Sequence, residues 1–288
     1  MPEAESPPLN DERGRSPDLA AETVACLFGF TEAPEARELP EATLERQLLW
    51  RRVGSVTALV GLVPLSDYRG LDGEGPARDI AWLAPRLHRH AELVAWMAQR
   101  SSVFPAPFAT LYASLESLTT FMRTHEATIA AFLRAVAGKE EWELRAAAHF
   151  GDPSDLDRLA CEAWPDWRGL SKGARYLRLC RDKSALIDFG RAKAAAQVDQ
   201  FVAGLRVLTD EAKSLAPSRA PDPDGGEPVA RYALLVAKRD VAALQARVAD
   251  AAPTAASDGV TLALSGPWPP FSFRPSLQTP NGPDRDGA

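Results

Sequence analysis

Four histidines are the side chains in this chain best suited to metal or acid–base chemistry, but their spacing favours neither. His88 and His90 would point about 200° away from each other around a helix and cannot jointly hold one metal ion, so we expect surface histidines. His125 beside Glu126, and the isolated His149, lack the HExxH, Hx3H or cysteine companions of a zinc site. The sequence therefore predicts no metal site. An unrecognised enzyme site around His125, Glu126 or His149 is the rival hypothesis.

Motifs for covalent or phosphate chemistry are missing from the sequence. Ser265-Gly266 is followed by prolines rather than by the helix that a Gly-x-Ser-x-Gly elbow requires. The glycine-containing segments 70–75 and 169–173 lack the residues or the spacing of a phosphate-binding loop. The carboxylates Glu140-Glu141 begin a predicted strand and do not suggest an acid–base pair. We therefore expect no catalytic residue, no cofactor and no enzyme activity.

Charge is distributed unevenly along the chain, whose net charge is −6. Residues 1–45 hold 11 acidic and 3 basic side chains, so the remainder, with 28 acidic and 30 basic, is nearly neutral. No dense stripe of lysine and arginine is present, and we expect no nucleic acid partner. The densest basic cluster consists of Arg175, Arg178, Arg181 and Lys183; it predicts either a solvated helix face or a surface for an acidic partner.

The sequence predicts a cytoplasmic protein that does not interact with a membrane. It does not begin with a basic segment followed by an apolar block, and no run of about 18 apolar residues occurs. The three cysteines, Cys26, Cys161 and Cys180, are an odd number without a CxxC spacing, and each lies in an apolar or helical-looking stretch. We expect reduced thiols in the core.

The elements that would position any site fall into two α+β domains with a tail at each end. Residues 1–22 are acidic and proline-rich, which predicts a flexible tail, and residues 276–288 form a second tail rich in proline, glycine and aspartate. Gly138 is a natural helix terminator and marks the boundary between domains at 23–138 and 139–275. Each domain is long enough to bury a core of its own.

Apolar periodicity gives the elements of the N-terminal domain. We expect strands at 24–30, 53–63 and 102–110, and helices at 77–100 and 115–138, the last of which is one helix or two. Pro105 and Pro107 cannot donate hydrogen bonds to a ladder, so any strand that contains them is an edge strand or is broken.

The C-terminal domain combines strands with a long helical seam. Alternating polar and apolar residues at 141–146 predict a strand with one wet face. In the seam, apolar residues recur at steps of three and four. Its positions are Leu177, Cys180, Ser184, Ile187, Arg191, Ala194, Val198, Phe201, Leu205, Leu208, Ala212 and Leu215. Gly190 and Gly204 are the points at which the helix could break. The seam either packs on the sheet of its own domain or forms an exposed strip for a partner.

A proline-rich aromatic segment, Gly266–Phe273, follows the last predicted elements, which are a loop at 216–228, a strand at 232–236, a helix at 241–248 and a strand at 260–264. Its three prolines fix φ and remove three backbone donors, so we expect the chain to leave the sheet there as a stiff, extended arm. Trp268, Phe271 and Phe273 are the candidate partner-binding residues. They either close the core of their own domain or dock on a partner. A buried Trp268 would favour the first role and an exposed one the second.

The sequence of this arm, Gly-Pro-Trp-Pro-Pro-Phe-Ser-Phe, resembles the signature with which members of the GvpL/GvpF family of gas vesicle proteins commonly end their last strand. The resemblance covers about residues 23–275 and includes the segments 58–68, 90–110, 141–145, 173–177 and 232–236. The chain departs from the family at residues 107–110, where Pro-Phe-Ala-Thr replaces the more usual Arg-Phe-Gly-Thr, and in a first strand that is less rich in tyrosine.

The resemblance implies a ferredoxin-like N-terminal domain and a C-terminal α+β domain with long helices. It brings no catalytic, cofactor-binding or metal-binding residue. It also implies an accessory protein of gas vesicle formation, found in the cytoplasm and at the gas vesicle, with the small hydrophobic shell protein GvpA and other accessory Gvp proteins as partners. Two roles fit: a chaperone-like or nucleating factor, or an integral minor component that stays in the finished vesicle.

Overall fold

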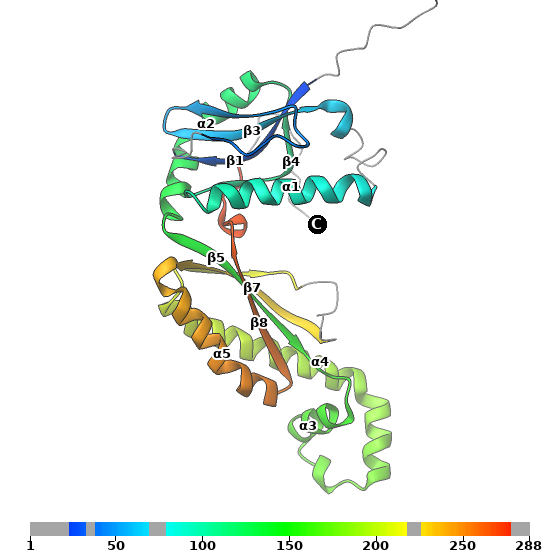
Figure 1. Ribbon diagram of the computed structural model, residues 1–288. Helices are drawn as coiled ribbons and strands as arrows, with labels where there is room; N and C mark the ends of the chain where they lie inside the picture. The colour runs from blue at the N-terminus through cyan, green and yellow to red at the C-terminus, as the bar shows by residue number, and fades with distance from the viewer. Residues whose placement is uncertain (1–22, 33–37, 69–78, 218–225, 278–288) are drawn as a thin grey trace, which may run out of the picture.

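The computed structural model describes residues 23–32, 38–68, 79–217 and 226–277. The expected tail at 1–22 and nearly all of the tail at 276–288 lie outside these residues. The described chain forms two four-stranded antiparallel sheets with helices packed on them (Figure 1), which confirms the α+β class. No helix in the described part of the chain is long and apolar enough to cross a membrane.

The first sheet has the strand order β2-β3-β1-β4. Its strands are β1 (Thr23–Thr31), β2 (Gln47–Val53), β3 (Val56–Pro64) and β4 (Phe104–Tyr112). A hairpin on one side of β1 and the last strand on the other side give the strand order of a ferredoxin-like domain, as the resemblance implied. The arrangement differs in its helices, because the described part of the β1–β2 connection contains no helix and an additional helix follows β4.

Helices cover both faces of this first sheet (Figure 1). They are α1 (Ile80–Ala98) and α2 (Leu115–Ala135), and a short 3-10 helix, η1 (Leu65–Tyr68), follows β3. Successive residues of a strand point to opposite faces. Accordingly, Cys26 lies in one apolar cluster with Leu93 of α1, and Leu27 lies in another with Met122 of α2. Two covered faces explain why β1 is apolar at nearly every position.

The strand predicted at 53–63 corresponds to β3, which begins three residues later than expected, but β2, its partner in a hairpin, was not predicted. Gly54 adopts a φ of +55°, which glycine reaches without strain, and the chain reverses there between β2 and β3. The carboxylate of Glu126 on α2 accepts hydrogen bonds from the Ser55 N–H (2.9 Å) and hydroxyl (3.1 Å). This partner is distant in sequence, and the local pattern gave no sign of it.

The proline-containing strand β4 lies at the edge of the first sheet, as predicted. Its pairing with β1 is also interrupted, since Gly29 lies opposite Pro105 whereas Leu27 lies opposite Thr110. Within the interruption Ala109 has a φ of 58°, a left-handed conformation that residues with a side chain rarely adopt. The prediction of an edge or broken strand is therefore confirmed in both respects.

The second sheet has the strand order β6-β7-β5-β8. Its elements are β5 (Lys139–Ala148), α3 (Pro153–Ala163), η3 (Trp167–Gly169), α4 (Lys172–Gly204), η4 (Leu205–Val207), β6 (Glu211–Leu215), β7 (Glu227–Ala237), η5 (Lys238–Asp240), α5 (Val241–Ser257), β8 (Val260–Trp268) and η6 (Phe271–Phe273). Strands and main helices alternate as β-α-β-β-α-β, with the α3–α4 region at the first helix position. The C-terminal half thus has the complete ferredoxin-like arrangement.

The predicted seam is only partly correct. Its middle part packs on the sheet of its own domain, where Ala194 and Val198 are buried. Gly190 does not break α4, but the helix ends at Gly204, and Ala212 and Leu215 belong to strand β6 instead. The buried residues of α4 recur every four positions from Leu186 to Val202. The predicted seam alternates steps of three and four, so towards the N-terminus it moves away from the buried face, and its first residue, Leu177, is exposed.

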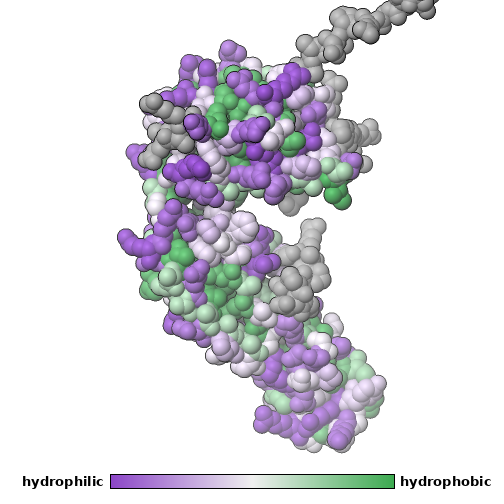
Figure 2. Space-filling view, in the orientation of Figure 1, coloured by the Kyte–Doolittle hydropathy of each residue, from purple (hydrophilic) through white to green (hydrophobic). Residues whose placement is uncertain are grey.

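The start of α4 belongs to a small lobe that the sequence did not predict. Helix α3 and the first part of α4 enclose their own apolar cluster around Trp167 and Leu186. Figure 2 shows this lobe at the far end of the molecule, beyond the two larger bodies. The indole N–H of Trp167 donates to the carboxylate of Asp157 (2.7 Å), which satisfies its only polar atom.

Burial differs from the expectation at three residues. Glu141 was expected on a wet strand face, yet it is only 6% exposed. His90 was expected at the surface, but it is buried beside the backbone carbonyl of Ala106, 3.0 Å from Nε2, and burial lowers its pKa. Cys180 was expected in the core and is exposed, whereas Cys26 is buried.

Candidate partner-binding site

The arm remains in the sheet longer than predicted. Strand β8 extends to Trp268, which lies opposite Glu141 of β5, so the expectation that the chain leaves the sheet at Gly266 was wrong. An irregularity makes this possible: Glu143 pairs with Ser265 and Glu141 with Trp268, which gives β8 one extra residue. A Cβ on Gly266 would lie 2.8 Å from the ring of Trp142, so only glycine fits at this point without movement.

The structure divides the three candidate aromatic residues between two environments. Phe273 is buried, whereas Trp268 is 52% exposed and Phe271 is 37% exposed. Phe273 belongs to an apolar cluster that also contains Leu235 of β7 and Phe132 of α2. It therefore contacts a core shared by residues from both sides of the proposed domain boundary at residues 138 and 139. Trp268, the last residue of β8, and Phe271 therefore lie at the surface.

A buried carboxylate holds the far end of the arm. Glu141 accepts hydrogen bonds from the Ser272 N–H (3.0 Å) and from the Ser272 hydroxyl (2.7 Å). Lys213 of β6 donates to the Ser272 carbonyl oxygen (3.1 Å), and its ammonium lies 5.2 Å from the centre of the Phe273 ring. Burial raises the pKa of the Glu141 carboxyl above its ordinary range, and the two hydrogen bonds from Ser272 oppose this shift.

The exposed ring of Trp268 lies beside a small cavity between the two bodies of the molecule, which meet at a narrow waist (Figure 2). The cavity has a volume of about 140 Å³. It is lined by the end of α1, by the α2–β5 junction and by Pro267–Pro270. Lys139 and Lys238 contribute its positive charges; Lys139 pairs with Asp210 (3.4 Å), and Lys238 has no ion-pair partner among the described residues.

The residues of the rival enzyme hypothesis do not come together. His125 and Glu126 lie on α2 in the first half of the molecule, and Glu126 is engaged by Ser55. His149 follows β5 and lies 3.0 Å from the Thr261 hydroxyl. None of the three lines the cavity beside Trp268. Among the described residues, no group of three or more histidine, cysteine or acidic side chains is placed to hold a metal ion.

Sequence reasoning named the aromatic residues of the arm but missed the residues that anchor it. Glu141 and Ser272 are 131 positions apart, so no local pattern links them. The one available signal was an acidic residue in a strand next to a buried tryptophan, Trp142, and the strict alternation of that strand favoured an exposed carboxylate.

The fold is shared with known proteins. Residues 26–275 match the family model described as gas vesicle synthesis protein GvpL/GvpF. The crystal structure of the gas vesicle protein GvpF from Anabaena sp. PCC7120 superposes with a TM-score of 0.65 and 13% identity, over 89% of this chain and all of that one. GvpF from Microcystis aeruginosa gives a TM-score of 0.59 at 13% identity, over 88% of this chain and 99% of that one. At this identity the structures establish a common fold.

A curated sequence gives a shorter match. Gas vesicle protein L2 of Halobacterium salinarum is 44% identical over 52 residues, which is 18% of this chain and 18% of that protein. The matched region is thus a small part of that relative's length. The family model, in contrast, spans most of the chain, from β1 to the end of the arm. The chain therefore belongs to the GvpL/GvpF family of gas vesicle synthesis proteins.

Proposed function

We propose that this protein is an accessory factor of gas vesicle assembly that binds the hydrophobic shell protein GvpA and other Gvp proteins in a chaperone-like or nucleating role, without enzyme activity. It would act in the cytoplasm and at the growing vesicle. The observation that carries this proposal is the pair of exposed rings, Trp268 and Phe271, on an arm that is fixed at both of its ends.

An aromatic ring held in place is a favourable docking element. Pairing of Trp268 with Glu141 fixes one end of the arm, and the buried Phe273 ring with the Ser272 hydrogen bonds fixes the other. The chain between them contains Pro269 and Pro270, both buried, which restrict the backbone further. Little conformational entropy remains to be lost when a partner binds, and a central aromatic anchor contributes on the order of 2 kcal/mol to such a contact.

The chemistry of the expected client suits this surface. A very hydrophobic shell protein exposes apolar area before it assembles, so a protein that keeps it soluble needs accessible apolar rings of its own. Trp268 also has an indole N–H, which points to the Ser265 hydroxyl at 3.4 Å and leaves the ring face available. A partner segment would cover this face and extend into the adjoining 140 Å³ cavity.

The test replaces both exposed rings in a vesicle-forming host that lacks its own copy of the gene. The double variant Trp268→Ala, Phe271→Ala should capture GvpA at least about tenfold more weakly in a pull-down and should give few or deformed vesicles in electron micrographs. The matched control is Tyr176→Ala, Leu177→Ala, which removes two large side chains that are 67% and 69% exposed on α4. Normal vesicles and unchanged capture in the arm variant would refute the proposal.

Fractionation then distinguishes the chaperone-like role from that of an integral minor component. Vesicles are floated, washed and probed for this protein with an antibody. A factor that acts only during assembly should stay in the cytoplasmic fraction, whereas a shell component should remain with washed vesicles in a fixed ratio to GvpA. The arm variant also distinguishes the two roles. If the contact is transient, its loss reduces the number of vesicles and leaves the composition of those that form unchanged.

A further inference from the structure

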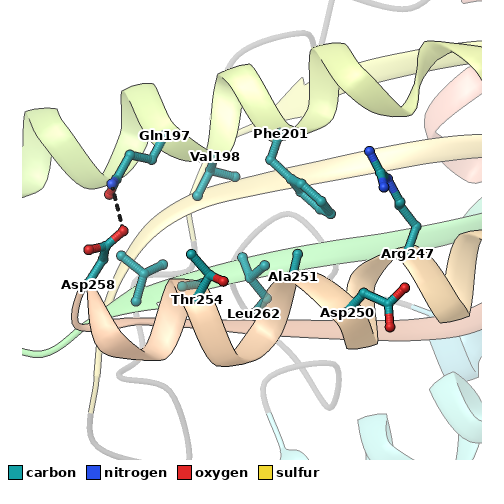
Figure 3. Close-up of a pocket in the computed structure, with 11 residues that line it drawn as sticks. Gln197, Val198, Phe201, Arg247, Asp250, Ala251, Thr254, Asp258 and Leu262 are labelled. Atoms are coloured by element: carbon teal, nitrogen blue, oxygen red, sulfur yellow. Dashed lines mark hydrogen bonds between the residues drawn. The ribbon is translucent and has the colours of Figure 1, made fainter.

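A groove runs between α4 and α5 on the second domain, at the opposite end of β8 from the arm. Its volume is about 380 Å³, within the range of about 300–1,000 Å³ typical of cavities that hold a ligand. Figure 3 shows the two helices side by side, with Val198 and Phe201 of α4 pointing towards Thr254 and Ala251 of α5. From Val260 in the groove to Trp268 in the arm, the strand spans about 26 Å.

Side-chain sizes on the two helices create this groove. The face of α5 that lines it carries small residues, among them Ala251 and Ala255, opposite the larger Val198 and Phe201. Leu262 of β8 also lines it. The residues named here are apolar, and all except the buried Val198 are partly exposed. An apolar surface of this kind in a concave site gains free energy when another apolar group displaces its water.

Polar side chains mark both ends of the groove. At one end the Gln197 amide donates to the carboxylate of Asp258 (3.1 Å), which bridges α4 and α5. At the other end Arg247 extends from α5 towards α4, with Asp250 next to it (Figure 3). Neither Arg247 nor Asp250 forms an ion pair with another residue that the structure describes. The open end therefore presents a guanidinium that reaches across the groove without an ion-pair partner among the described residues and, three residues along α5, a carboxylate that is equally unpaired.

The chain itself offers poor candidates to fill the groove. The segments outside the described residues contain only four large apolar side chains, Met1, Leu9, Leu19 and Leu71. A groove between two antiparallel helices that lie side by side is suited to a third helix, whose side chains at positions i and i+4 line up on one face. The unpaired guanidinium of Arg247 adds a requirement for a carboxylate on that helix.

We propose that this groove is a second docking surface, which binds an amphipathic helix of another protein. The helix places two large apolar side chains, one turn apart, against Phe201, Ala251 and Leu262, and it places a carboxylate beside Arg247. This surface is separate from the arm, so its existence does not depend on the role assigned to Trp268. A protein with both surfaces can hold two partners, or two parts of one partner, at once.

Synthetic peptides with the full-length protein test the charge requirement. The first probe is a fluorescein-labelled 16-residue helical peptide with two leucines four positions apart and a glutamate one turn beyond, and the second probe has lysine in place of that glutamate. In fluorescence anisotropy the wild-type protein should bind the glutamate peptide about fivefold more tightly than the lysine peptide. Arg247→Glu should reverse this preference, because the new carboxylate repels the glutamate of the first peptide and attracts the lysine of the second. The matched control, Arg239→Glu, changes an exposed arginine outside the groove and should leave the preference as in wild type.

A groove-filling variant tests the apolar requirement. Ala251→Trp should abolish binding of both peptides, and a circular dichroism melt checks that the variant is folded. The proposal is overturned if the wild-type protein binds neither peptide at 1 mM, or if Arg247→Glu leaves the preference unchanged. A wild-type dimer in light scattering that Ala251→Trp converts to a monomer would also overturn it, since the occupant would then be a second copy of this chain. The arm variant Trp268→Ala, Phe271→Ala should bind both peptides as wild type does. A failure of the groove proposal can therefore be told apart from a failure of the assembly proposal.

Discussion

Glu141 is a carboxylate that the fold keeps away from water and uses as the acceptor for both polar hydrogens of Ser272. Because its pKa is raised in the folded protein, the folded state holds the Glu141 proton more tightly than the unfolded state does. Its contribution to stability is therefore fully present below the ordinary glutamate pKa and is lost as the pH rises through the raised value. Glu141→Gln should not lose stability in this window, because the amide has no proton to release.

The measurement is urea unfolding of wild type and Glu141→Gln between about pH 4 and pH 8. The difference in the free energy of unfolding should move in favour of the glutamine variant as the pH rises. Glu141→Ala, which leaves the Ser272 N–H and hydroxyl without acceptors, should cost about 1–3 kcal/mol at any pH in this range. Parallel pH profiles for wild type and Glu141→Gln would show that the carboxyl titrates as an exposed group does.

Single residues also show how far sequence reasoning about the arm reaches. Trp268, Phe271 and Phe273 could be named as candidates because large rings among prolines either pack in a core or dock on a partner. Phe273 has the same composition around it, yet it is buried. What separates the rings is contact with Phe132 and Leu235, residues that are distant in the sequence.

At the scale of elements, the extra residue in β8 depends on Gly266. Gly266→Ala should lower the free energy of unfolding by about 1–3 kcal/mol, because its φ of 153° is rare for residues with a side chain and the new methyl group would meet the Trp142 ring. Gly173→Ala is the control: no atom lies within 4 Å of its added Cβ, and alanine is the better helix former. Equal stability of the two variants in thermal melts would argue against a strained irregularity in β8.

Elements with their own local signals were predictable, and those defined by distant partners were not. Strand β1 and helix α2 follow from apolar patterns and terminators within their own residues. Strand β6 does not, because Ala212 and Leu215 continue a helical spacing and become a strand only by pairing with β7. The β2–β3 turn likewise depends on Glu126, which is 71 residues after Ser55 in the sequence.

At the scale of the whole molecule, Phe273 connects the two halves. Phe273→Ala should lower the free energy of unfolding by about 3 kcal/mol, because it empties a site in a cluster to which both halves contribute. Phe271→Ala changes the same residue type two positions away, where the ring is 37% exposed, and should cost less than about 1 kcal/mol. Urea unfolding monitored by tryptophan fluorescence compares the two. A cost for Phe273→Ala no greater than that for Phe271→Ala would show that the ring does not hold the halves together.

The long separation in sequence between Phe273 and strand β1 has a consequence for synthesis on the ribosome. The cluster that begins with Ala25 and Leu27 of β1 is completed by a residue translated almost 250 positions later. Chains grow at about 5–20 residues per second, so the first sheet waits for tens of seconds or less with part of its apolar surface open. During that interval the nascent chain has neither its closed core nor its arm. A chain made as far as Phe273 is thus the first species that has both, so the core of the first sheet closes at the same stage at which the arm is fixed.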